Sequence, residues 1–232
     1  SLSVTESTLF HGGASQKGGA IYNDTLALLH VANTSIERNI APSGAAIHSE
    51  QSGVSLQQSL VAQNDADSAT GTVIRIASGT IPTASGTSTR ATINDSTISS
   101  NTGVALSVPR EVRLLGLTVV ANSAGVDFGF DDVNTSNSII AGNGSDCLNV
   151  GATTRFKNNL FISAGCPTGL AADGNRRLTG SGDEKLFAGS DSLAATCDAP
   201  PAKGLLCPLG NYGGSTRTHK PRLLVCYNVF TE

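Results

Sequence analysis

The stretches Ile98-Ser99-Ser100-Asn101, Val119-Val120-Ala121-Asn122 and Ile140-Ala141-Gly142-Asn143 repeat one pattern: an apolar residue, two variable residues and an asparagine. These three asparagines follow one another at intervals of 21 residues. The pattern also occurs earlier, as Ile36-Glu37-Arg38-Asn39 and Val61-Ala62-Gln63-Asn64. A repeat of this length is typical of one coil of a β-solenoid and is too short for a βαβ unit.

Alignment of the copies on the asparagine predicts seven coils. The asparagine position is held by Gly12, Asn39, Asn64, Asn101, Asn122, Asn143 and, by extrapolation, Ala164. A cluster of glycine and apolar residues follows each copy, as in Gly18-Gly19-Ala20-Ile21 and Gly125-Val126-Asp127-Phe128. Two short strands separated by a bend, and then a third strand, form the cross-section of a parallel β-helix. We therefore predict an all-β fold, a right-handed parallel β-helix of about seven coils over residues 1–170, with an irregular capping or anchor-like segment over 171–232.

The repeated asparagines have a structural interpretation. Stacked coils lie about 4.8 Å apart, so equivalent side chains of successive coils contact one another. An asparagine amide both donates and accepts, and asparagine tolerates a left-handed backbone at a bend. The residues Asn39, Asn64, Asn101, Asn122 and Asn143 are therefore expected to form a hydrogen-bonded column. The alternative is that the five amides line a binding groove, but an inward column satisfies them without a ligand.

Composition agrees with short strands and tight turns. Only 14% of the 232 residues are charged and 4% are aromatic, whereas 26 are glycine, which is unlike the composition of a helical bundle. A formal net charge of -3 gives no general attraction for nucleic acid, and no apolar run is long enough to span a membrane. The largest insertion, residues 77–92, reads as a polar loop or as an extra irregular half-turn.

Five cysteines lie in the second half of the chain. Cys147 and Cys166 are expected at the same corner of adjacent coils, and Cys197 and Cys207 flank a proline-rich loop. We predict that each couple forms a disulfide, as in an oxidising compartment, which leaves Cys226 over. No metal site is predicted, because the chain has no Cys-x-x-Cys motif and no histidine close to a cysteine in sequence.

The C-terminal part also carries a resemblance. Asn159-Leu160-Phe161, Gly165-Cys166-Pro167 and the stretch from Cys207 to His219 resemble the terminal signature of bacterial surface proteins with a choice-of-anchor type of C-terminal module. This resemblance covers about residues 140–220 and implies an exported right-handed parallel β-helix that is held at the cell surface. The asparagine repeats are more weakly similar to those of polymorphic membrane proteins, which are autotransported adhesins. The resemblances imply a secreted or cell-surface location.

Parallel β-helices serve both sugar-chain cleavage and plain surface recognition, so the fold alone does not choose between them. A lyase would need carboxylates that hold calcium and a basic residue, and a hydrolase would need two carboxylates across the scissile bond. The candidate residues are Asp127, Asp131, Asp132 and Asp146, with Arg110 and Arg113 one coil earlier. The pair of adjacent aspartates also reads as a turn between strands.

Other catalytic signals are weak. The chain has no tryptophan to stack on a sugar ring, and its histidines have no triad spacing. His30 and His48 are expected to point into solvent. We therefore predict a non-catalytic surface module that recognises a protein or glycan partner through its flat faces and the loops 66–92 and 123–135. The alternative is a carbohydrate-active enzyme, a polysaccharide lyase or glycoside hydrolase, which alone would require calcium.

Overall fold

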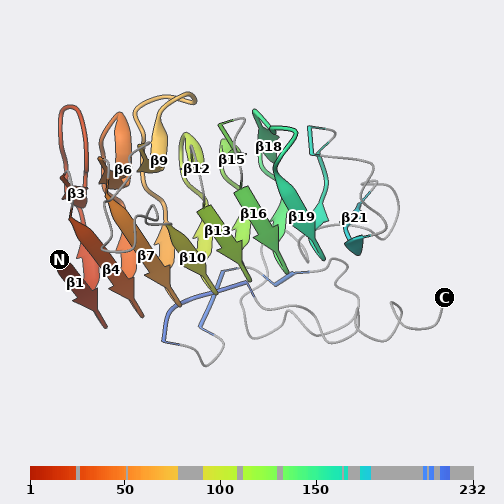
Figure 1. The fold of residues 1–232 in the computed structure, drawn as a ribbon. Helices are drawn as coiled ribbons and strands as arrows, with labels where there is room; N and C mark the ends of the chain where they lie inside the picture. The colour runs from red at the N-terminus through yellow and green to blue at the C-terminus, as the bar shows by residue number, and fades with distance from the viewer. Residues whose placement is uncertain are drawn as a thin grey trace, which may run out of the picture.

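A computed structural model of the chain describes residues 1–24, 27–50, 52–77, 91–108, 112–129, 133–163, 165–166, 173–178, 206–207, 209–211 and 215–219. Its strands form three parallel sheets, which are the three sides of a parallel β-helix. The coils stack along one axis, from the N-terminal coil at the left of Figure 1 to the C-terminal coil at the right. The predicted fold class, an all-β parallel solenoid of about seven coils, is confirmed.

Each of the first six coils contributes one short strand to each sheet, and the C-terminal coils contribute to fewer sheets. Sheet A contains β1 (Leu2–Thr5), β4 (Leu28–Ala32), β7 (Gly53–Gln57), β10 (Thr92–Asn94), β13 (Val112–Leu115), β16 (Val133–Ser136) and β19 (Arg155–Lys157). Sheet B contains β2 (Thr8–Phe10), β5 (Ser35–Glu37), β8 (Leu60–Ala62), β11 (Thr97–Ser99), β14 (Thr118–Val120), β17 (Ile139–Ala141), β20 (Leu160–Phe161) and β21 (Arg176–Arg177). Sheet C contains β3 (Ile21–Asn23), β6 (Ser43–Ser49), β9 (Thr72–Ile76), β12 (Val104–Ser107), β15 (Ala124–Asp127) and β18 (Cys147–Leu148).

Columns of aliphatic side chains fill the interior of the solenoid. The column of sheet B contains Ile36, Val61, Ile98, Val119 and Ile140, which are all fully buried. In the last coils the interior is aromatic, because the Phe156 ring packs edge-on against Phe128 at 5.2 Å and against Phe161 at 5.5 Å between ring centroids. The repeated apolar position of the sequence is thus the core position of sheet B.

The five repeated asparagines form one hydrogen-bonded column. Each of the first four donates its backbone N–H and its side-chain Nδ2 to the Oδ1 atom of the next, at 2.8–3.1 Å. At the N-terminal end, the N–H of Gly12 donates to Asn39. At the other end, Asn143 donates to Asp146, whose second oxygen accepts the N–H groups of Ile162 and Ser163. Ala164, the extrapolated seventh position, lies outside the described residues.

The bend at this column differs from our expectation in one respect. The residue with the left-handed backbone is not the asparagine but the residue before it. This position is held by Arg38, Gln63, Ser100 and Ala121, with φ between 55° and 58°, and by Gly142, with φ of 68°. The asparagine is therefore required for its hydrogen bonds and not for its backbone conformation.

A second polar column, which the sequence analysis did not anticipate, lies at the bend between sheets A and B. The N–H of Thr34 donates to Ser59 Oγ at 3.1 Å, and the N–H of Ser59 donates to Ser96 Oγ at 3.2 Å. Further along, Ser138 donates to Asn159, which donates to Asn175. At both bends, side-chain acceptors therefore bind backbone N–H groups that the sheets leave unpaired, although the second column is interrupted at Leu117.

One predicted disulfide is present in the described residues. Cys147 and Cys166 are bonded, with 5.0 Å between their Cα atoms, and both are buried. Cys207 is also disulfide-bonded. Its predicted partner Cys197 lies outside the described residues, as does Cys226, so that pairing stays a prediction.

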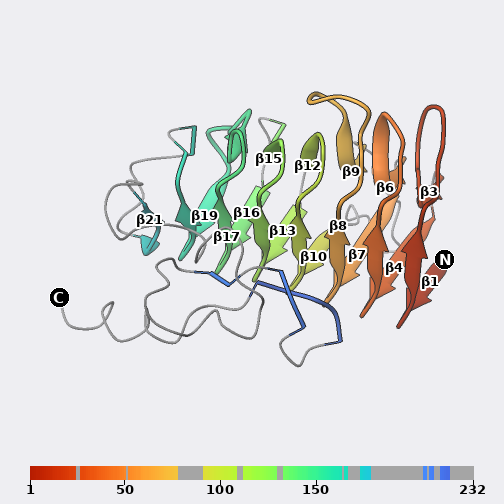
Figure 2. The same ribbon diagram turned by 180° about the vertical axis from the view of Figure 1, so that it is seen from behind.

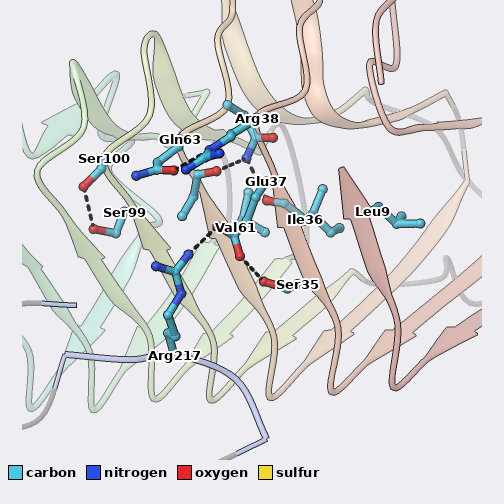
Figure 3. A network of polar contacts seen from close by, with 12 residues as sticks. Leu9, Ser35, Ile36, Glu37, Arg38, Val61, Gln63, Ser99, Ser100 and Arg217 are labelled. Carbon is cyan, nitrogen blue, oxygen red and sulfur yellow. Dashed lines mark hydrogen bonds and ion pairs between the residues drawn. The ribbon is translucent and has the colours of Figure 1, made fainter. Parts of the chain in front are cut away.

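The described part of residues 206–219 lies along the outer face of sheet B. Gly210 and Thr218 pair in an antiparallel bridge, and we call the described residues of 206–219 the hairpin. Figure 2 shows it in blue beside the solenoid, and Figure 3 shows Arg217 reaching Glu37 of β5, with which it forms an ion pair. Its contacts span five successive coils, from Ser215 on Asn33 to Leu206 on Val120 and Ala141. The division at residue 170 and the capping role of 171–232 stay predictions.

A buried histidine fastens this hairpin. His219 is 6% exposed, and its ring nitrogens lie 2.9 Å from Ser99 Oγ and 2.8 Å from the carbonyl oxygen of Cys207. Burial lowers the pKa of His219, because the charged ring would lose its hydration. The lowered pKa means that, below the ordinary histidine pKa of about 6.5, the open hairpin binds more protons than the closed one.

The hairpin is therefore expected to loosen in acid. As pH falls from about 7.5 to about 5, the amides of Gly210 and Thr218 should lose protection from hydrogen exchange, after correction for the intrinsic exchange rate, and most of this loss should occur below about 6.5. His219→Gln should remove most of this pH dependence, while amides inside β8 and β11 serve as the reference. Protection that is constant over this pH range in the unaltered protein would contradict the prediction.

Candidate recognition face

The structure does not bring the described members of the predicted acidic site together. Asp127 lies at the end of β15 in sheet C, where its carboxylate accepts hydrogen bonds from the Gly129 N–H and from Asn149 Nδ2, at 3.1 and 2.9 Å. Arg113 projects from sheet A, on another side of the solenoid. Asp146 is 1% exposed and ends the asparagine column. Asp131, Asp132 and Arg110 lie outside the described residues.

Sheet C carries a cluster of a hydroxyl, an imidazole and a carboxylate. The Nδ1 atom of His48 lies 3.0 Å from Ser43 Oγ, and its Nε2 atom lies 2.9 Å from Glu50 Oε1. Lys17 forms an ion pair with the same carboxylate. Hydrogen bonds from Lys17 and then His48 hold the pKa of Glu50 below its usual value. The expectation that His48 points into solvent is wrong, since the residue is only 2% exposed.

This cluster has the residue types of the hydroxyl–imidazole–carboxylate triad of a hydrolase, but a substrate could not reach the imidazole. The Tyr22 ring is stacked on His48, with 5.7 Å between ring centroids, and so covers the imidazole. The nearby N–H of Gly44 donates to Thr72 Oγ1 at 3.1 Å. It is therefore not available to stabilise an oxyanion. The cluster instead joins Lys17, β6 and Thr72, which belong to three successive coils.

The outer face of sheet A is the more accessible side. Sheet B carries the hairpin on its outer face, where Ala62, Ser99 and Val120 are fully buried although they point away from the core. In sheet A, by contrast, every outward side chain of the described strands is exposed or half-buried, and only the outward Gly53, which has no side chain, is buried. We call these outward side chains the A face.

Two parallel columns make up the A face. The first column contains Ser3, His30, Ser55, Thr92, Arg113, Asn134 and Arg155. The second contains Thr5, Ala32, Gln57, Asn94, Leu115, Ser136 and Lys157. Neighbours within a column are one coil apart, about 4.8 Å. Neither column contains an acidic residue, so the A face is polar and carries a positive charge at its C-terminal end.

A shallow groove lies at the N-terminal end of the A face. It has a volume of about 310 Å³ and is lined by Ser1, Leu2, Ser3, Leu28, Leu29, His30, Gly53, Val54, Ser55 and Thr92. Leu2 and Leu28 are nearly half exposed, at 47% and 48%. The groove thus combines an apolar wall with a line of hydroxyl groups and one imidazole, which suits a ligand with both polar and apolar surfaces.

These residues were missed because outward positions do not repeat. The core columns carry nearly identical residues in every coil, whereas the A face carries a different residue in almost every coil. The only available signal was the alternation of polar and apolar residues around Val31, Leu56 and Ile93. Because successive side chains of a strand point to opposite faces, this alternation predicts that the polar residues share the outward face.

Within the part of the chain that the structure describes, no group of three or more His, Cys, Asp or Glu side chains is placed to hold a metal ion. The same residues include no helix with the length and hydropathy needed to cross a membrane. Comparison of the chain with protein-family models, with curated proteins and with solved structures finds no match, so neither resemblance noted in its sequence is tested by a relative.

Proposed function

We propose that the chain is a non-catalytic recognition module of a secreted or cell-surface protein, and that it binds a glycan or protein partner through the A face. The observation that carries this proposal is an accessible, seven-stranded polar face without an acidic side chain, next to a groove. A buried disulfide fits an oxidising compartment. The similarity to bacterial choice-of-anchor surface proteins and, more weakly, to polymorphic membrane proteins supports the same location.

A rigid scaffold suits such a role. Each coil is held to the next by three sheet ladders and by side-chain columns at two bends, so the A face is ordered before a partner arrives. Binding to a preorganised surface avoids the entropy cost of ordering loops. Loops 66–92 and 123–135 stay candidate contacts, although 78–90 and 130–132 lie outside the described residues.

The test is a binding screen against immobilised glycans and matrix proteins. Ser55→Trp should fill the groove without disturbing the core, because Ser55 points outward from β7. We expect it to weaken binding at least about tenfold, or ~1.4 kcal/mol. The matched control is Arg75→Trp, at an exposed outward position of sheet C. Equal affinities for both variants and the unaltered protein would contradict recognition through the A face.

The enzyme alternative is tested separately. Incubation with pectin, alginate and glycosaminoglycans, with and without calcium, should release no unsaturated sugars and no new reducing ends. Release that depends on Asp131 or Asp127, as shown by replacement of each with alanine, would establish the lyase or hydrolase alternative instead.

A further inference from the structure

The basic side chains of the A face have no partner, a property that they share with Arg75 of sheet C but not with several other cations of the described residues. Lys17 and Arg217 form ion pairs with Glu50 and Glu37. Arg38 donates to Gln63, and Arg177 donates to the carbonyl oxygen of Cys166. By contrast, Arg113, Arg155 and Lys157 are exposed and form no hydrogen bond or ion pair with any described residue. Their hydrogen-bonding groups are directed to solvent and are available to a ligand.

These three cations have a regular arrangement. Arg113 pairs with Asn134, which pairs with Arg155, so the two arginines lie two coils apart, about 10 Å. Lys157 follows Arg155 by two residues and projects from the same side of β19. Asn134 and Ser136 lie between the cations as neutral hydrogen-bonding groups. The result is a sparse row of positive charges on a flat polar background.

We propose that the C-terminal end of the A face binds a polysaccharide that carries carboxylate groups, with uronate carboxylates at Arg113 and Arg155. This inference rests on the proposed function and names the ligand class for the same face. A planar guanidinium donates two parallel hydrogen bonds to the two oxygens of a carboxylate. Asn134, Ser136 and Thr92 supply groups for sugar hydroxyls, and a chain with repeating units matches a surface that repeats coil by coil.

Charge and composition argue against other polymers. A heavily sulfated glycan or a nucleic acid carries more negative charges per unit length than three cations can match. Nucleic acid single strands also require aromatic stacking platforms, and neither column contains an aromatic residue. A protein–protein interface usually has an apolar centre, and the apolar area that Leu115 and Ala32 contribute to the two columns is too small for one. Asp173, one coil beyond Lys157, adds a negative charge only at the edge of the face.

The experiment measures binding of the folded chain to four immobilised polymers. These are hyaluronan, with one carboxylate on every second sugar, polygalacturonate, with one on each sugar, heparin, which is heavily sulfated, and neutral dextran. We expect hyaluronan or polygalacturonate to bind, dextran not to bind, and binding to weaken as NaCl screens the charges. A single uronic acid should not compete, because it cannot span two coils.

Variants locate the site. Arg113→Gln and Arg155→Gln should each weaken polyuronate binding about three- to tenfold, and Arg155→Lys should lose less because it keeps the charge. Arg75→Gln is the control, since Arg75 is also exposed and its replacement removes the same charge from sheet C. Circular dichroism checks that each variant is folded.

The outcomes separate this inference from the proposed function. One outcome is that polyuronates do not bind, whereas dextran or a protein binds and Ser55→Trp abolishes that binding. The recognition role then stands, and the carboxylate assignment is overturned. The carboxylate assignment is also overturned if heparin binds more tightly than hyaluronan and polygalacturonate. An effect of Arg75→Gln on polyuronate binding equal to that of Arg155→Gln overturns it as well. If no bound polymer responds to any A-face variant, both proposals fail.

Discussion

Asn101→Ala is expected to lower the free energy of unfolding by about 3–5 kcal/mol, one of the largest effects of any single substitution in this chain. The Asn101 side chain is 3% exposed. Its amide donates to Asn122 Oδ1 and to the carbonyl oxygen of Val61, and its Oδ1 accepts from the N–H and Nδ2 of Asn64. Alanine would leave a buried backbone N–H and a carbonyl without partners, in a site too enclosed to admit bulk water.

Urea denaturation followed by circular dichroism would measure this loss. Ser100→Ala is the matched control, because Ser100 is exposed and Ala121 occupies the equivalent left-handed position of the next coil, with φ of 57°. That control should stay within about 0.5 kcal/mol of the unaltered protein. If Asn101→Ala were as stable as Ser100→Ala, the column would not be a stabilising feature, and its repetition would need another explanation.

The core of the fold was predictable because stacking makes equivalent positions chemically alike. Asn101, Asn122 and Asn143 occupy one environment in successive coils, so the same residue recurs and the period is visible in the sequence. The second column was not recognised because a hydroxyl or an amide can accept the same N–H group. Thr34, Ser59 and Asn159 therefore differ in type while serving one role.

The side of the solenoid was less predictable than its interior. Arg217 and Glu37 are 180 residues apart, and no local pattern announces their ion pair. The A face depends on register, since Arg113 and Arg155 become neighbours of Asn134 only when the coil lengths are known. The predicted acidic site placed Arg113 one coil before Asp127 and stacked against it, but the two residues belong to one coil, on sheets that face different directions.

Removal of the disulfide by Cys147→Ala combined with Cys166→Ala is expected to destabilise the C-terminal coils by about 2–4 kcal/mol. The bond closes a loop with a sequence separation of 19 residues, and its loss frees the unfolded chain of that constraint. The two side chains are 4% and 1% exposed and pack in the core, so their truncation adds a small cavity. A reducing agent would be a poorer test, because Cys207 is also in a disulfide.

The location of the effect follows from the architecture. In a solenoid each coil contacts only its neighbours, so a weakened last coil opens before the rest of the rod. Hydrogen exchange should therefore accelerate first in β18 and β20, while β4, β5 and β6 keep their protection. A uniform loss of protection along the whole solenoid would mean that the chain opens in one step. Unchanged protection in β18 and β20 would show that the Phe128, Phe156 and Phe161 cluster holds this end without the covalent bond.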